Sequence, residues 1–263
     1  PSLQGCPSGL RRVVAGRFYH GVDIKNCKPT VLLEWARREQ LHHLGILREA
    51  VERRGDVLRR IGDFYGTEPA KCKFVILRIL SGGDEREWIR EANCPRNETS
   101  TAPELEEMKE CHLTIRKAMF RKHASRVESL RQQWKAKADA KVRNTLAEAR
   151  AEPTSKQRRA AFEKASLKAT NAAIDRSIFC LFYFEEEDRI LHQMDASFRR
   201  AGWNVGSLIY DALLVEHHAE ADLQDAMKAA EAVVRQTLGY TVRLHEETLF
   251  DARARASEDN FWN

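Results

Sequence analysis

The sequence predicts an α+β fold, in which an antiparallel sheet packs on helices and a large helical region is inserted. Two observations predict this class. A short strand-like run ends near Ile24, and a strand–hairpin–helix–strand series follows Gly202. Helical patterns fill almost all of the chain between them.

The first quarter of the chain predicts one strand and two helices. The strand covers residues 16–24, and a helix from Thr30 to Arg38 follows, with Pro29 in its first turn. A second helix with a loose apolar stripe runs from Leu41 to Ile61. Residues 63–68 are expected to form a polar turn.

The middle of the chain predicts helices only. Pro69 suits the first turn of a helix, and Ser81-Gly82-Gly83 ends that helix with a left-handed cap. The apolar run SIFCLFYF, residues 177–184, would suit a strand by composition, but its flanks continue a helical pattern. The predicted helices are 69–80, 84–92, 103–151 and 156–201.

The last part of the chain predicts the rest of the sheet. Two apolar, β-leaning runs, Val205–Tyr210 and Ala212–Val215, flank Asp211 as a hairpin. A helix from about Ala221 to Leu238 is capped by a glycine. The run TVRLHEETLF forms the final strand.

Two aspartates on separate strands are candidate ligands of a divalent metal. Asp211 stands alone between two strands with no Gly or Asn beside it, so a rigid hairpin would hold it partly shielded from water. Asp23 ends the first strand, before a helix. Two acids in one place are the minimum for metal-assisted phosphoryl or nucleotidyl transfer. Each also has an ordinary explanation, as a turn residue for Asp211 and a helix cap for Asp23.

Positive charge is concentrated in one segment. The net charge is +5, but residues 113–160 contain 14 Lys or Arg against 4 Asp or Glu. A polyanion would be attracted to such a segment, although a solvated helix with ion-pair partners elsewhere is an equal alternative. The candidate nucleic-acid contacts are Arg116, Lys117, Arg121, Lys122, Lys135, Lys137, Lys141 and Arg143.

Composition excludes several classes. The chain is 43% hydrophobic and 32% charged, and no run approaches 18 apolar residues, so we expect no membrane span. The six cysteines form no CxxC pair, which predicts free thiols in a reducing compartment and no zinc site. The nine histidines show no ligand spacing and are expected on the surface.

The start carries no secretory signal pattern, so we expect an intracellular protein, with nucleus, organelle and cytoplasm left open. Because the chain begins at Pro1, we expect a fragment or a processed chain.

Three motifs occur in a familiar order. The run VDIKNCKPT follows an Asp-x-x-Asn-x-x-Pro-Thr pattern, and PAKCKFVILRILSGGDE places a lysine and a glycine as in a polymerase fingers helix. Tyr210-Asp211-Ala212 stands at a hairpin tip. Together, over roughly residues 16–251, they resemble the palm and fingers of family A DNA polymerases, in the divergent form of large DNA viruses and some eukaryotic genomes. The matched positions are Asp23, Asn26, Pro29, Thr30, Lys73, Gly82 and Asp211.

The resemblance implies an assignment of regions and roles. It implies a palm-like sheet formed by 1–40 and 171–263, and a fingers-like helical region over 41–170. It implies Mg²⁺ as the cofactor, and a template–primer nucleic acid and a nucleoside triphosphate as partners. A helicase or primase would be a further protein partner. The implied metal ligands are Asp23, Asp211 and the backbone carbonyl of Ile24, and the implied triphosphate contacts are Lys73, with Lys71 and Arg78 as secondary ones.

The chain also departs from the family pattern. Pro69 occupies the position of a fingers arginine, Ser81 that of a tyrosine, Tyr210 that of a histidine and Ala212 that of a secondary carboxylate. These changes bear on nucleotide selection more than on metal binding. The first hypothesis is therefore template-directed nucleotidyl transfer, and the second is a catalytically degenerate module that binds nucleic acid. A helical scaffold whose two aspartates lie far apart is the third.

Overall fold

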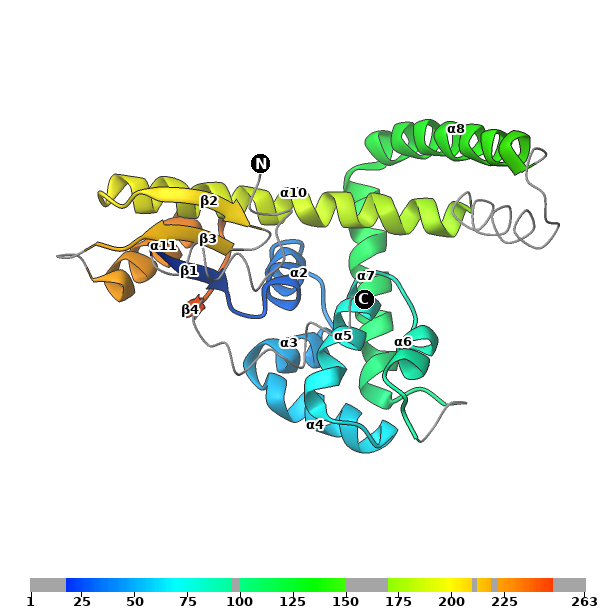
Figure 1. Ribbon diagram of the computed structural model, residues 1–263, viewed down its shortest axis with the longest axis horizontal. Helices are drawn as coiled ribbons and strands as arrows, with labels where there is room; N and C mark the ends of the chain where they lie inside the picture. Colours follow the sequence, from blue (N-terminus) through cyan, green and yellow to red (C-terminus); the bar gives the residue numbers. More distant parts are fainter. Residues whose placement is uncertain (1–17, 96–99, 150–169, 210–211, 219–221, 248–263) are drawn as a thin grey trace. The chain divides into compact units, whose positions relative to one another are not determined.

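A computed structural model of the chain has the α+β fold that the sequence predicts (Figure 1). Helices account for 71% of it, and they accompany a small, open antiparallel sheet. Within the ranges that are described, no helix combines the length and the apolar character that crossing a membrane requires. The residues that the structure describes are 18–95, 100–149, 170–209, 212–218 and 222–247.

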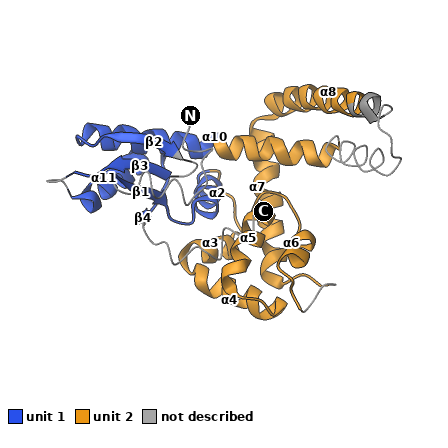
Figure 2. Ribbon diagram, viewed as in Figure 1, with its two compact units in different colours: residues 1–38, 185–263 blue, residues 39–184 orange. Residues whose placement is uncertain are grey.

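The chain divides into two compact units (Figure 2). The first combines Pro1–Arg38 with Glu185–Asn263, and the second is Glu39–Phe184. The second unit is thus inserted into the first. The sequence placed the corresponding boundaries after residues 40 and 170.

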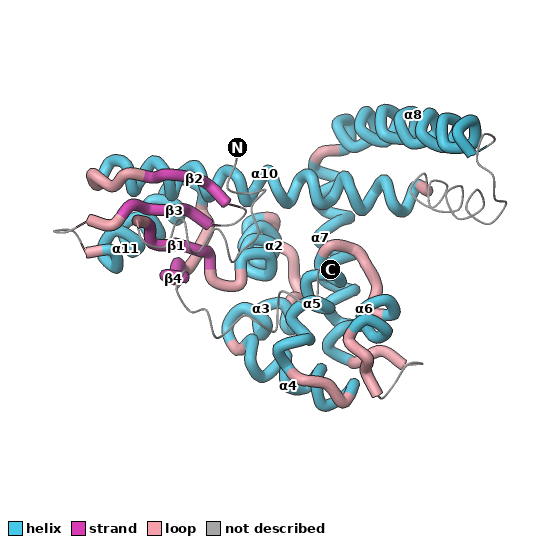
Figure 3. Tube along the Cα trace, viewed as in Figure 1, coloured by secondary structure: helices cyan, strands magenta, loops and turns pink. Residues whose placement is uncertain are grey.

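The sheet belongs to the first unit (Figure 3). In the described residues it has four antiparallel strands in the order β2-β3-β1-β4, so the first strand in sequence lies in the interior. One face is mostly apolar, because Val22 and Ile24 alternate with Asp23 and are buried, as are their neighbours Leu213 and Leu244 on the flanking strands. The strands are β1 (Tyr19–Ile24), β2 (Val205–Ile209), β3 (Ala212–Glu216) and β4 (Leu244–Glu247).

Three helices contribute to the first unit in the residues that the structure describes. They are α2 (Cys27–Arg38), the second half of α10 (Asn171–Arg200) and α11 (Leu223–Leu238). The helix α11 begins where the Asp222 carboxylate accepts a 2.7 Å hydrogen bond from the Gln224 amide, and it ends at Gly239, whose φ of 72° is left-handed as expected. The expected start of α2 at Thr30 is wrong. Asn26, at a φ of 53°, turns the chain directly after β1, so the helix begins at Cys27.

The run SIFCLFYF is helical and lies within α10. Ile178, Phe179, Phe182 and Tyr183 are buried, whereas Phe184 is exposed. Buried positions at i, i+1, i+4 and i+5 follow the helical repeat and not the alternation of a strand. The spacing of the apolar residues therefore decides the structure of this run, and their composition does not.

The described part of the second unit is helical. Its helices are α3 (Gly45–Glu52), α4 (Arg54–Tyr65), α5 (Pro69–Leu80), α6 (Arg86–Glu91), α7 (Pro103–Lys122), α8 (Ala124–Ala149) and the first part of α10. The expectation of one helix over 41–61 is wrong, because Arg53 leaves the helical conformation. Buried Ala50 and Val57, on either side of this break, are seven residues apart, so the apolar period conceals it. His123 likewise interrupts the predicted 103–151 helix.

The helix α5 has the bounds that the sequence predicts. Pro69 is its first residue, and Gly82 follows it at a φ of 81°. The amides of Gly82 and Gly83 donate to the carbonyls of Ile79 and Arg78, at 2.8 and 2.9 Å. These bonds satisfy carbonyl groups at the end of the helix.

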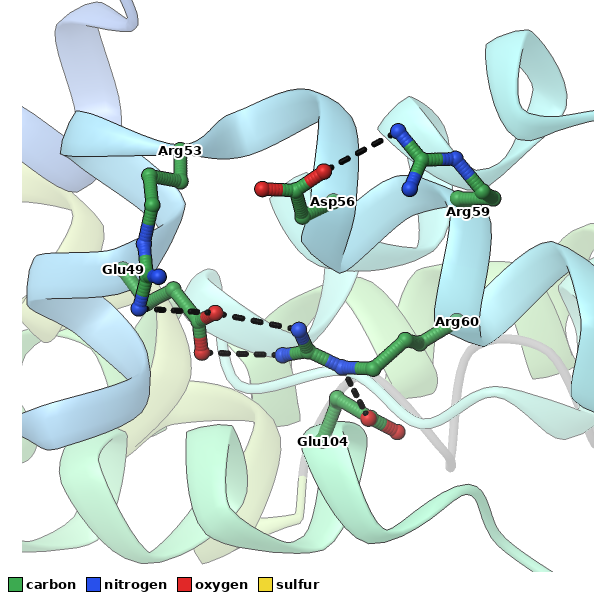
Figure 4. A network of polar contacts seen from close by, with 6 residues as sticks. All are labelled: Glu49, Arg53, Asp56, Arg59, Arg60 and Glu104. Carbon is green, nitrogen blue, oxygen red and sulfur yellow. Dashed lines mark hydrogen bonds and ion pairs between the residues drawn. The ribbon is translucent and has the colours of Figure 1, made fainter.

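Arg60 ties three helices of the second unit together (Figure 4). Its guanidinium, on α4, donates two hydrogen bonds of 2.8 and 3.0 Å to the Glu49 carboxylate on α3 and one of 2.7 Å to Glu104 on α7. The hydrogen bonds from Arg60 hold the pKa of Glu49 below its usual value. This arrangement is a bidentate, charge-assisted link, which fixes orientation better than a single ion pair.

A second polar link is buried. Glu85 accepts hydrogen bonds from the Thr101 hydroxyl and from the Lys109 ammonium, the latter at 3.1 Å. Burial alone would raise the pKa of Glu85, but the hydrogen bonds from Thr101 and Lys109 outweigh it, so the pKa is lowered. This carboxylate therefore stays ionised inside the unit.

We expect Arg60→Gln to lower the free energy of unfolding at neutral pH, because Glu104 loses its ion pair with Arg60 and Glu49 keeps only its pair with Arg53. Since the pKa of Glu49 is depressed below its ordinary value of 4.5, its stabilisation is present above that value and is lost as the pH falls through the folded-state pKa. Urea denaturation at pH 7 and at about pH 3.5 measures the free energy of unfolding of wild type and variant. The difference between the two proteins should be smaller at the acidic pH. Ile61→Val, fully buried on the same helix, is the control and costs about 0.5–1.5 kcal/mol at either pH. An Arg60→Gln penalty of equal size at both pH values would contradict this account.

We expect the described thiols to differ in reactivity. Those of Cys27, Cys72, Cys94, Cys111 and Cys180 are free. Burial raises the pKa of Cys72 to about 12 and that of Cys111 to about 11, so almost no thiolate forms at pH 8. Brief iodoacetamide treatment of the native protein, followed by peptide mass spectrometry, should label half-buried Cys180 first and Cys72 and Cys111 only after urea is added. Native labelling of Cys72 at the rate of Cys180 would show that burial does not control this thiol.

Candidate functional site

Asp23 lies near the end of β1, between the neighbouring strands β3 and β4. The antiparallel register pairs it with Ala212 on β3 and with His245 on β4. Register partners point to the same face of a sheet, with Cβ atoms about 4.5–5.5 Å apart. The three residues therefore share one face, opposite the apolar face that carries Val22 and Ile24.

The face that carries Asp23 is more open than the apolar one. Asp23 and Ala212 are half-buried and His245 is exposed. Asn26, and not Asp23, occupies the position directly before α2. Asp23 therefore belongs to the strand rather than to the start of the helix.

The second candidate aspartate, Asp211, lies outside the described residues, as does Tyr210. In the sequence Asp211 directly precedes Ala212, which is the register partner of Asp23 on β3. One candidate ligand is therefore paired with the chain neighbour of the other, although 188 positions separate the two aspartates. Ile24, the candidate carbonyl ligand, is buried and is paired with Leu244.

Hydrogen bonds hold the backbone just beyond the paired Asp23 and His245, where β1 ends and β4 begins. Beyond β1, the Lys25 amide donates to the Arg243 carbonyl at 2.8 Å. The Leu244 amide donates to the Glu231 carboxylate of α11 at 2.6 Å. The strand pair thus continues past Asp23 and is tied to a helix.

The described side chains on this face supply only part of the ligand set that a divalent cation needs. Asp23 offers the carboxylate oxygen that Mg²⁺ prefers. In the part of the chain that is described, no group of three or more His, Cys, Asp or Glu side chains is arranged to hold a metal ion. The described residues thus supply one hard ligand, and any further carboxylate would have to come from outside these ranges.

The three candidate triphosphate contacts lie on α5 in the second unit, and Arg78 is already engaged. Its guanidinium donates to Glu87 at 2.6 Å and to Glu91 at 3.2 Å, both on α6. Gly83 makes room for it, because a Cβ there would lie 2.7 Å from the Arg78 Cγ. Arg78 therefore fastens α6 to α5.

Lys73 and Lys71 differ from Arg78. The half-buried Lys73 makes no hydrogen bond or ion pair with a described residue. The Lys71 carbonyl accepts a 3.0 Å hydrogen bond from the indole of Trp88, and its side chain lines an open hollow of about 690 Å³ together with Asp63, Glu68 and Asn93. Lys71 and Lys73, unlike Arg78, therefore keep side-chain cations that no described carboxylate engages.

The eight candidate nucleic-acid contacts also separate into two groups. Lys122 forms an ion pair with Glu39, and Lys135 forms one of 3.0 Å with Asp139. The others make no ion pair within the described ranges, and all but half-buried Arg116 are exposed. The unpaired group is Arg116, Lys117, Arg121, Lys137, Lys141 and Arg143.

Helix geometry accounts for part of this charge. The first turn of α7 carries Glu104 and Glu106, and its last turn carries Arg121 and Lys122. This order complements the helix macrodipole, so these cations have a structural role that requires no nucleic acid.

Over residues 124–144, one side of α8 carries cations without acids. At about 100° per residue, Gln133, Lys137 and Lys141 fall on one side of the helix, and Glu128 and Asp139 fall on the opposite side. No acidic residue of the 124–144 stretch interrupts the first side. We name Lys137 and Lys141 the α8 lysine pair.

His245 is the residue of this site that sequence reasoning missed. It was expected to be an unremarkable surface histidine, because histidine spacing gives no signal. Its place beside Asp23 comes from the pairing of β1 with β4, whose residues are more than 200 positions apart in the sequence. The alternation of TVRLHEETLF could indicate the face of His245, but not its neighbour.

No known family model matches this chain, and a search of curated proteins found no relative.

Proposed function

We propose that the protein carries out metal-dependent, template-directed nucleotidyl transfer, as a DNA polymerase-like enzyme. The observation that supports this most is the register of β1 with β3, in which Asp23 is paired with the residue after Asp211. Two carboxylates that meet at this edge of the sheet would suit a reaction that transfers a nucleotide to a 3′-hydroxyl.

In this proposal the first unit acts as a palm-like part and α5 as a fingers-like helix. Asp23, Asp211 and the Ile24 carbonyl would hold Mg²⁺, which would supply Lewis-acid stabilisation of the attacking and leaving oxygens. Lys73 would contact the β- and γ-phosphates and supply a proton to the departing pyrophosphate. Because Arg78 is engaged by Glu87 and Glu91, we assign it a structural role first.

The template–primer would be held by its phosphates. The unpaired cations of α7 and α8 give a contact that depends on salt and carries no sequence information. Lys122 and Lys135 contribute less, because each already faces a carboxylate.

A second function, nucleic-acid binding without chemistry, is favoured by different observations. Pro69 is the first residue of α5, where the family has an arginine, and Arg78 is held by two carboxylates. Ser81 offers no aromatic ring to close over a base pair. Such a chain would keep its basic helices and lose nucleotide selection.

We expect primer extension with Mg²⁺ to fall at least about a hundredfold in Asp211→Asn and in Asp23→Asn, since metal stabilisation supplies several kcal/mol and each 1.36 kcal/mol is a factor of ten. Asp225→Asn, an exposed aspartate on α11, is the control and should leave extension unchanged. Extension that survives both changes would refute the catalytic assignment. DNA binding without extension by the wild type would favour the second function.

We expect replacement of the α8 lysine pair by glutamine to weaken duplex DNA binding. Each lost phosphate contact should reduce the steepness of log K against log salt by about 0.9. The slope of the double variant should therefore be shallower than that of the wild type by roughly 2. Fluorescence anisotropy over a range of salt concentrations measures this slope. Lys135→Gln is the matched control, because Lys135 is paired with Asp139. Equal losses in the control and the double variant would exclude a specific role for this side of α8.

A further inference from the structure

His245 stands beside Asp23 on the open face of the sheet. The register makes them a cross-strand pair, which places their Cβ atoms about 4.5–5.5 Å apart. An aspartate and a histidine at this separation can direct a carboxylate oxygen and a ring nitrogen to a common point above the sheet. The pair joins residues that the sequence keeps far apart.

The imidazole of His245 is free to take a ligand. It is exposed and makes no hydrogen bond or ion pair with any described residue. The next residue, Glu246, points to the opposite face and is paired there with the His20 Nδ1 at 2.7 Å. Strand alternation therefore places Glu246, which is bound to His20, on one face and the unbound His245 imidazole on the other.

The backbone around the pair is held in place before any ligand arrives. The 2.8 Å bond from the Lys25 amide to Arg243 and the 2.6 Å bond from the Leu244 amide to Glu231 lie just beyond it, where β1 ends and β4 begins. On its other side, Val22 is paired with Glu246 in the same ladder. A cation would therefore meet two donors on hydrogen-bonded strands and not on loops, which favours a defined geometry.

We propose that His245 and Asp23 form a divalent-cation site that prefers a transition-metal ion such as Mn²⁺ to Mg²⁺. Carboxylate oxygens suit both ions, but an imidazole nitrogen is a poor ligand for Mg²⁺ and a good one for first-row transition metals. This inference rests on the proposed function, because it takes Asp23 as a metal ligand, and it adds the nitrogen donor and the metal preference.

Mn²⁺ binding to the full chain, without nucleotide or DNA, tests the site. Electron paramagnetic resonance of free Mn²⁺ gives the dissociation constant, and competition with Mg²⁺ gives the preference. His245→Ala should weaken Mn²⁺ binding at least about tenfold and change Mg²⁺ binding far less, since it removes the nitrogen donor. His245→Asp, which supplies oxygen instead, should shift the preference toward Mg²⁺. His218→Ala, an exposed histidine of the same unit, is the control and should bind Mn²⁺ as the wild type does.

The outcomes separate this site from the proposed function. Mn²⁺ affinity that is unchanged in His245→Ala, or equally reduced in His218→Ala, overturns the site even if primer extension depends on Asp211. The protein could also bind Mn²⁺ through both Asp23 and His245 and yet extend no primer. That outcome supports the metal site and refutes only the polymerase proposal.

Discussion

The first unit depends on the pairing of β1 on both of its sides. This strand comes first in the described chain but lies in the interior of the sheet, between β3 and β4. Its partners follow about 190 and 220 residues later. Closing loops of this length is costly in entropy, although the cost grows only slowly with length. The buried face, with Val22 and Ile24 of β1 fully enclosed, supplies the hydrophobic free energy that offsets it.

The inserted unit is organised by packing among α3, α4, α5 and α7, and by ion pairs of a few arginines. Arg60 bridges α3, α4 and α7, whereas Arg78 fastens α6 to α5. Both use charge-assisted bonds to two carboxylates, which fix helix orientation as well as contributing energy. The same chemistry explains why Arg78, a secondary candidate for a triphosphate contact, has a structural role: Glu87 and Glu91 compete with any phosphate for its guanidinium.

The candidate site follows from the alternation of a strand. Because successive side chains point to opposite faces, β1 encloses Val22 and Ile24 and presents Asp23 to the open face, and β4 sends His245 and Glu246 in opposite directions. A shift of one residue in either pairing would exchange these faces. The apolar face therefore sets the register, and the register decides which polar groups can meet.

Local signals in the sequence determined the α+β class and several element bounds. Pro69 and Ser81-Gly82-Gly83 delimit α5, Gly239 caps α11, and the spacing of residues 177–184 makes that run helical. Each signal acts within a few residues, so a single sequence suffices to find it. The breaks at Arg53 and His123 were missed, because the apolar period continues through them. The pair of Lys135 with Asp139, four residues apart on α8, lay within reach of local spacing. Only the tertiary structure decided that Glu87 and Glu91 of another helix hold Arg78, and that His245 lies beside Asp23. These two facts depend on contacts between separate elements, which no local pattern encodes.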